Sequence, residues 1–258
     1  MKTVAWIAVA AVVVACSSDP ETTPSVDAGE GTGSNDAGGG RDGDVTRDDG
    51  GSDDAGGASC TAAAEQLLQP IDAVSTGEVT VLSEADGVKT LFVDASAGGT
   101  QGASANPRLY VSLENARRVD VTDRTAATSM AWDLAIKRPI FFTNSGDGGA
   151  GEGGAILIAK DFDAVTSADA SGQTFAPESF LEDDCTAKVD ATGAVRTSFD
   201  GWYRYDQATN ILTPEAGTWL VKGATGKLYK LRILSYYATP DGGVGQSGGR
   251  YTLKVGAL

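Results

Sequence analysis

The chain has 258 residues and carries 35 acidic and 20 basic side chains, which gives a net charge of −15 at pH 7. It contains no histidine, and this absence excludes Ser-His-Asp triads, Cys-His pairs and His-ligated zinc or haem. The acidic balance offers no basic patch to a phosphate backbone, so nucleic acid is not expected as a partner.

The first 15 residues have the composition of a signal peptide. Lys2 supplies a positive charge, and residues 4–14 form an apolar run that is too short to span a bilayer. The run ends in Val-Val-Ala-Cys at residues 13–16, an order that resembles the bacterial lipobox. The resemblance implies cleavage before Cys16 and attachment of acyl chains to it, so the lipid bilayer is an expected partner. A plain signal peptide with an incidental cysteine is the alternative.

Residues 16–58 follow as the lipidated cysteine and a Gly/Asp-rich stalk. They hold repeats of Asp-Ala-Gly and almost no apolar side chains, so the segment cannot offset its ordering entropy and is predicted to be disordered. Ser17 and Ser18 stand where Asp often signals retention in the inner membrane. This favours an exported outer-membrane lipoprotein that faces either the periplasm or the cell exterior.

The remaining segment, residues 59–258, has the apolar and aromatic content of one folded domain. Its two cysteines, Cys60 and Cys185, are expected to form a disulfide because export places them in an oxidising compartment. A free reactive thiol is the alternative. Residues 61–68 suit a short helix that Pro70 ends.

Almost every later segment predicts a strand. Alternating or apolar runs occupy residues 78–82, 89–93, 109–113, 132–143, 155–158, 219–222, 227–237 and 251–255. The clearest unit is a hairpin that turns at residues 223–226, because Tyr229, Leu231 and Ile233 alternate with Lys230 and Arg232. We therefore expect an all-β fold, an antiparallel sandwich or open barrel of many short strands with at most one or two short helices.

Two blocks carry a family resemblance. The first is Ala-Trp-Asp-Leu-Ala-Ile at residues 131–136, followed by Thr-Asn-Ser-Gly at residues 143–146 and a glycine run to Gly154. The second is Trp-Leu-Val-Lys at residues 219–222, followed by residues 226–237. Together they resemble the HmuY family of surface lipoproteins, which contains haem-capturing proteins. The resemblance implies an exported all-β domain and marks as motif residues Trp132, Asp133, Thr143, Asn144 and Gly146.

The resemblance also makes haem, or another tetrapyrrole, a candidate ligand. Characterised members of the family hold haem iron between two axial side chains, usually His and in some relatives Met. The mature chain has no histidine and one methionine, Met130, and the first block is followed by Lys137 and Arg138. Met130 and Lys137 are therefore candidate ligand-binding residues, but they flank a predicted strand at an odd spacing, which places them on opposite faces. The residues themselves predict no metal site.

Three further patterns have competing interpretations. Residues 146–151 fit G-x-G-x-x-G, but a strand follows where phosphate binding needs a helix, so a flexible hairpin loop is favoured. Asp133 is interpreted as a buried structural carboxylate rather than a catalytic one, because no second carboxylate can be paired with it. Tyr203, in the aromatic run at residues 202–205, either packs in the core or stacks against a ligand.

These observations indicate a membrane-anchored exported lipoprotein. Its HmuY-like domain would bind haem, another tetrapyrrole or a different small hydrophobic ligand without His ligation. The alternative is a structural or adhesive surface lipoprotein that binds protein or polysaccharide, and no motif supports an enzyme. A deep apolar pocket near residues 130–155 would favour ligand binding, whereas a flat, well-packed sheet would favour the alternative.

Overall fold

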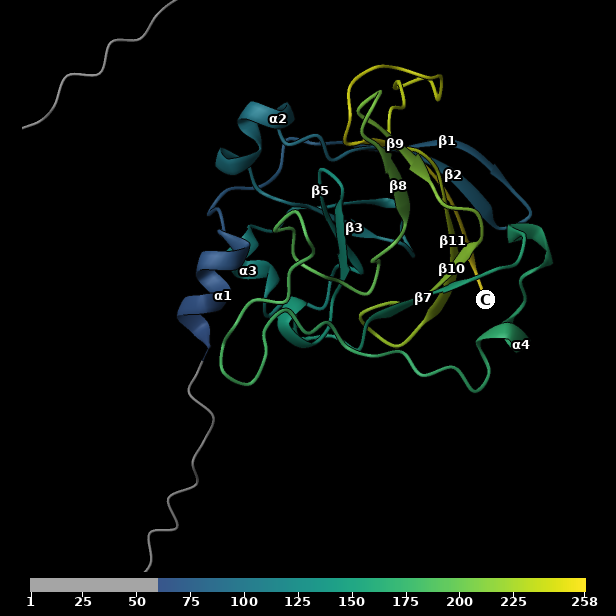
Figure 1. Cartoon of the computed structure of the whole chain (residues 1–258). Helices are drawn as coiled ribbons and strands as arrows, with labels where there is room; N and C mark the ends of the chain where they lie inside the picture. The colour runs from purple at the N-terminus through teal and green to yellow at the C-terminus, as the bar shows by residue number, and fades with distance from the viewer. Residues whose placement is uncertain (1–59) are drawn as a thin grey trace, which may run out of the picture. The chain divides into compact units, whose positions relative to one another are not determined.

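The computed structural model describes residues 60–258 (Figure 1). The predicted signal peptide, the lipid attachment residue Cys16 and the stalk lie outside the described residues. The described part is all-β, as predicted, and its strands form three antiparallel sheets.

The largest sheet has six strands in the order β1-β2-β12-β11-β10-β7. They are β1 (Val79–Ala85), β2 (Val88–Asp94), β7 (Gly154–Ile158), β10 (Thr218–Lys222), β11 (Leu228–Ser235) and β12 (Arg250–Ala257). The predicted C-terminal hairpin is β10 and β11, in which Trp219 pairs with Leu231 and Lys222 with Leu228. Its turn closes at Gly226, whose φ of +83° suits glycine.

The other two sheets are smaller. A four-stranded sheet runs β4-β3-β5-β6, and β8 pairs with β9 in a separate hairpin. Their strands are β3 (Leu109–Ser112), β4 (Arg117–Val119), β5 (Leu134–Lys137), β6 (Ile140–Thr143), β8 (Tyr203–Asp206) and β9 (Ile211–Pro214).

The main core lies between the six-stranded and four-stranded sheets. Alternate residues of β2, β10, β11 and β12 point inward and meet those of β3, β5 and β6 in one buried cluster. Its members include Leu91, Val93, Leu109, Leu134, Ile136, Trp219, Leu231, Tyr251 and Leu253. This is the packing of a β-sandwich, and each fully buried aliphatic or aromatic side chain contributes about 1.5–3 kcal/mol.

The outer face of the four-stranded sheet is also covered. Helix α1 (Thr61–Leu68) and helix α3 (Asp123–Ala126) lie on the side of β3 and β5 that faces away from β10 and β11 (Figure 1). Leu67 and Leu68 of α1 pack there against a second buried cluster that contains Trp132 and Phe142. Helix α1 ends where predicted, because Gln69 takes a φ of 46° and Pro70 cannot continue the helix.

Several very short helices go beyond the sequence prediction. The α-helices α2 (Gly99–Gly102) and α4 (Ser167–Ala170) have four residues each, as α3 does. Three 3₁₀ turns also occur, at Ala103–Ala105, Gly146–Gly148 and Phe162–Ala164. A single turn is too short to show helical periodicity, so it can be found only from capping patterns such as that of Thr122 and Thr125 around α3.

The apolar run at residues 132–143 forms two strands rather than one. Strands β5 and β6 are joined by a tight turn at Arg138 and Pro139, and Arg138 has a φ of 53°. Proline has no N–H for the sheet, so it marks the break in the run. Met130 lies before β5 and outside any strand, so the predicted placement of Met130 and Lys137 on opposite faces of one strand is wrong.

The glycine run after β6 is not a hairpin loop. It leads from β6 in the small sheet to β7 in the large sheet, and Ser145 and Glu152 form a bridge within it. It is tightly packed, since a Cβ at Gly149 would lie 2.3 Å from the Asn144 Oδ1 and one at Gly151 would lie 2.6 Å from the Asn144 carbonyl oxygen. The glycines therefore let the run pack closely against Asn144.

Candidate functional site

The motif residue Asp133 lies at a junction between the two sheets, with 8% of its surface exposed. Its Oδ2 accepts a hydrogen bond from the Leu113 N–H at 2.8 Å, and its Oδ1 accepts one from the Ala224 N–H at 2.9 Å. These donors lie in the turns after β3 and after β10. Burial raises the pKa of the Asp133 carboxyl, while the backbone donors oppose that rise. Asp133 thus has the backbone partners that a buried structural carboxylate requires.

Asn144 extends this junction. Its Nδ2 donates to the carbonyl oxygens of Ser129 at 2.8 Å and Trp132 at 2.9 Å, and its Oδ1 accepts from the Gly151 N–H at 3.0 Å. The Trp132 indole N–H in turn donates to the Ala126 carbonyl oxygen at 2.9 Å. Every polar atom of the Asn144 side chain is therefore used to hold loops in place.

Glu178 is a buried acid that the sequence reasoning missed. Its Oε1 accepts hydrogen bonds from the Thr143 N–H at 2.7 Å and the Thr143 hydroxyl at 2.9 Å, and both of its oxygens are bonded to Ser198. Burial raises the pKa of Glu178, although these donors oppose the rise. Its only sequence signal is a position between Phe175 and Phe180. With Trp132, Asp133 and Asn144, it forms what we call the polar junction.

Three cavities surround the turn between β5 and β6. The first, the cationic cavity, has a volume of about 330 Å³ and lies between α1, this turn and residues 193–195. It is lined by Leu67, Leu68, Gln69, Ala103, Ser104, Arg108, Lys137, Arg138, Pro139, Ile140, Gly193, Ala194 and Val195.

The second and third cavities are richer in aromatic side chains. The aromatic cavity, of about 350 Å³, is lined by Phe141, Phe199, Trp202, Tyr203 and Tyr205 together with Asp190 and Asp200. The tyrosine cavity, of about 800 Å³, is lined by Tyr205, Tyr236 and Tyr237 together with Arg138 and Arg250. Pro139, Ile140, Ala194 and Val195 line both the cationic and the aromatic cavity. Arg138 and Tyr205 likewise each line two cavities, so the three form one cavity cluster.

The structure separates the three predicted ligand-binding residues. Lys137, at the end of β5, lines the cationic cavity, and Tyr203, at the start of β8, lines the aromatic cavity. Met130 is 45% exposed and lines none of the three cavities. Trp202 packs in the core and donates its indole N–H to the Pro139 carbonyl oxygen at 2.8 Å. Within the aromatic run, Trp202 is therefore a core residue and Tyr203 is half-buried at the cavity wall.

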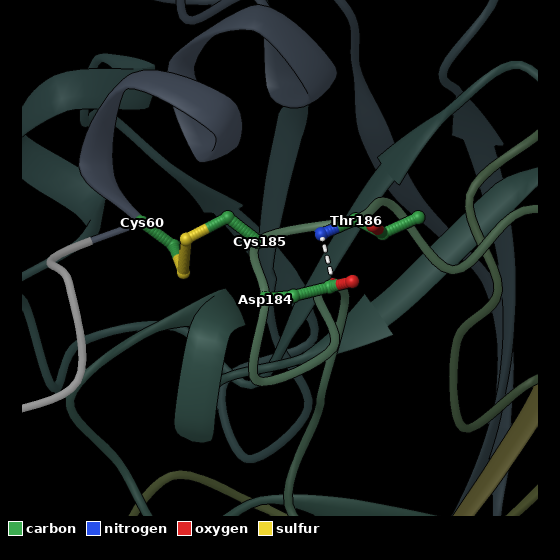
Figure 2. Close-up of a disulfide and its surroundings, with 4 residues drawn as sticks. All are labelled: Cys60, Asp184, Cys185 and Thr186. Atoms are coloured by element: carbon green, nitrogen blue, oxygen red, sulfur yellow. Dashed lines mark hydrogen bonds between the residues drawn. A yellow bond between two sulfur atoms is a disulfide. The ribbon is translucent and has the colours of Figure 1, made fainter.

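The expected disulfide between Cys60 and Cys185 is present in the structure (Figure 2). It joins the start of α1 to a loop in which the Thr186 N–H donates to the Asp184 Oδ1 at 2.9 Å (Figure 2). The cysteines are 125 residues apart in the sequence. The disulfide joins the start of α1 to the loop that precedes residues 193–195. Both α1 and residues 193–195 form walls of the cationic cavity.

Comparison with known proteins identifies the family. A family model described as HmuY protein matches residues 104–251, which is more than half of the chain. The chain belongs to the HmuY family. The matched range contains both motif blocks and excludes α1, β1 and β2. No curated protein matches the chain.

Three solved structures that are similar to this HmuY family member share between 14% and 17% sequence identity with it. A Bacteroides fragilis protein described as a lipoprotein has 17% identity and a TM-score of 0.42, covering 69% of this chain and 93% of its own. A Bacteroides vulgatus protein described as HmuY-like and haem-binding has 14% identity and a TM-score of 0.43, covering 69% and 96%. An apo HmuY analogue from Tannerella forsythia has 14% identity and a TM-score of 0.42, covering 67% and 99%.

The residues present do not fit haem held between two axial ligands in the manner implied by the family resemblance. The chain has no histidine, and Met130 and Lys137 do not line a common cavity. Burial, with Asp190 and Asp200, raises the pKa of Tyr203, which disfavours the phenolate form that binds iron. Within residues 60–258, no three Cys, Asp or Glu side chains gather in a way that could hold a metal ion.

Proposed function

We propose that this HmuY family member is an exported lipoprotein, anchored through Cys16, whose β domain binds a small ligand with an apolar body in the cavity cluster. Tetrapyrroles, held without paired axial ligation, are the first ligand class to test. The observation that carries the proposal is the meeting of three cavities at one turn. Their volumes lie in the range of about 300–1,000 Å³ typical of small-molecule sites, and aromatic side chains line two of them.

The test is a titration of the full chain with haemin and with metal-free protoporphyrin, followed by absorbance. We expect saturable one-to-one binding of both, because stacking and apolar contact do not require iron. Ala194→Trp, which places a large ring where the cationic and aromatic cavities meet, should weaken binding at least about tenfold, or about 1.4 kcal/mol. Ala191→Trp is the matched control, since Ala191 is exposed on the same segment. A flat titration of the unaltered chain would contradict the proposal and favour a protein or polysaccharide partner.

Membrane anchoring has a separate test. Cys16→Ala removes the expected site of lipid attachment, so the protein should move from the membrane fraction to the soluble fraction on centrifugation. None of the helices within residues 60–258 combines the length and hydropathy needed to span a bilayer. If Cys16→Ala protein still sediments with membranes, the lipid anchor is not what holds it there.

A further inference from the structure

The cationic cavity has an unbalanced set of charges. Its lining contains Arg108, Lys137 and Arg138 and no acidic residue. The neighbouring aromatic cavity has the opposite balance, with Asp190 and Asp200 and no basic residue in its lining. Of these two cavities, only the cationic cavity has basic side chains in its lining, and only the aromatic cavity has acidic ones.

Lys137 lies beside another positive charge. The ladder between β3 and β5 pairs Leu109 with Ile136, so Arg108 lies opposite Lys137 one residue beyond that pair. Like charges directly opposite each other on one face of a sheet are destabilising. Burial and then Arg108 lower the pKa of Lys137, and Asp123 only partly opposes them.

Within residues 60–258, Arg108 has hydrogen-bond partners and Lys137 has none. The Arg108 guanidinium donates to the Asp123 Oδ2 at 3.2 Å and to the Leu68 carbonyl oxygen at 2.6 Å. Asp123 also accepts hydrogen bonds from the Tyr110 hydroxyl and the Ile71 N–H, so both of its carboxylate oxygens already have donors. Among the described residues, no side chain or carbonyl group accepts a hydrogen bond from the Lys137 ammonium.

Arg138 adds positive charge from a strained position. Its φ of 53° is unusual for a residue with a Cβ. The turn is held by its N–H, which donates to the Ala95 carbonyl oxygen at 2.9 Å, and by its carbonyl oxygen, which accepts from the Tyr251 hydroxyl. A conformation of this kind persists only where the surroundings enforce it.

We infer that the cationic cavity binds an amphipathic organic anion, whose negative group pairs with the Lys137 ammonium and whose apolar body lies against Leu68, Ile140 and Val195. The inference rests on the proposed function, because it names the ligand class for one part of the cavity cluster. The half-buried Lys137 gains the partner that it lacks, and the repulsion from Arg108 is offset. The apolar side chains supply the hydrophobic surface that an ion alone would not use.

The experiment is calorimetric titration of the purified full chain with octanoate and, separately, with 1-octanol, which has the same apolar chain and no charge. We expect saturable octanoate binding and octanol binding at least about tenfold weaker, equivalent to about 1.4 kcal/mol. Lys137→Gln should reduce octanoate affinity by a similar factor. Lys222→Gln, which removes a lysine paired with Glu152 outside the cavity, should leave it unchanged. Equal binding by the Lys137→Gln and unaltered chains, or no octanoate binding at all, would overturn the inference.

The two proposals fail in different ways. If porphyrin binds and octanoate does not, the cavity cluster takes a ligand but the anion site is wrong. If octanoate binds through Lys137 and porphyrin does not, the anion site stands and tetrapyrroles are excluded as its ligand. If neither binds, both proposals fail.

Discussion

The polar junction and the cationic cavity lie at opposite ends of β5 and treat charge in opposite ways. At the junction, the carboxylates of Asp133 and Glu178 are buried, and hydrogen-bond donors surround both of them. At the cavity, the ammonium of Lys137 is half-buried and no acceptor within the described residues reaches it. Burying a charge costs stability, and hydrogen-bond partners offset that cost, whereas a charge without partners leaves it in place. The difference separates residues that build this domain from residues that are available to a ligand.

The largest effect should come from the junction. Asp133→Ala leaves the N–H groups of Leu113 and Ala224 without their acceptor, and it opens a cavity between the sheets. Hydrogen bonds to a charged group contribute about 1.5–3 kcal/mol each, so we expect the free energy of unfolding to fall by about 3–6 kcal/mol in urea denaturation. Asp72→Ala, at an exposed position, is the control and should change it little. A loss below about 1 kcal/mol for Asp133→Ala would show that the junction does not hold the sheets together.

Removing the disulfide should have the next largest effect. The double variant Cys60→Ser, Cys185→Ser frees a loop that spans 125 residues. We expect the free energy of unfolding to fall by about 2–4 kcal/mol, because the unfolded chain regains entropy. Urea denaturation with and without reductant measures it, and the reduced unaltered chain should match the double variant. A difference between these two proteins would point to an effect of the substitutions themselves.

Glu178 allows a smaller and pH-dependent test. Glu178→Gln places an amide N–H₂ among groups that are themselves donors, so we expect a loss of about 1–3 kcal/mol at neutral pH. Glu182→Gln, an exposed neighbour, is the control.

The pH dependence of this variant has a defined sign. Burial raises the pKa of Glu178 in the folded chain above the unfolded value of about 4.3. The folded chain then keeps a proton that the unfolded chain releases, so this contribution to stability is present below the unfolded pKa and is lost as pH rises through the folded pKa. Glu178→Gln should flatten that decline, so its cost relative to the unaltered chain should shrink as pH rises. If the two proteins had parallel pH profiles, the pKa of Glu178 would be the same in the folded and the unfolded chain.

The smallest effect on stability should come from the cavity. Lys137→Gln removes a half-buried charge that has no acceptor within residues 60–258, so the free energy of unfolding should change by no more than about 0.5 kcal/mol and should not fall. Thermal or urea denaturation measures this beside Lys222→Gln. A loss above about 1 kcal/mol would assign Lys137 to the scaffold and remove the contrast with the junction.

The sequence predicted most of the strands because alternation leaves a local trace, but it indicated neither β4 nor β9. The hairpin of β10 and β11, the helix at residues 61–68 and the family all follow from contiguous patterns. The sequence contains no comparable local signal for which strands belong to the same sheet. The connection from β6 to β7 looked like a hairpin because only distant partners, such as β10 for β7, show that the chain changes sheet.

The candidate site was predicted only in part. Lys137 and Tyr203 do line cavities. However, no pattern in the sequence around either residue indicates that Ala194 and Val195 also line these cavities. The contrast between Lys137 and Asp133 was also hidden, because the donors to Asp133 come from Leu113 and Ala224, 20 and 91 residues away. Local sequence identifies a charged side chain, but its partners are set by tertiary packing.

The position of the disulfide also determines how the domain carries a mechanical load. Any pull on the chain before residue 60 enters the domain at Cys60, the residue that precedes α1. The bond passes that force directly to the segment around Cys185. Helix α1 is therefore not peeled from the sheet by tension, because the covalent link takes up the force before the packing of Leu67 and Leu68 does. The wall of the cationic cavity that these leucines form keeps its shape under tension.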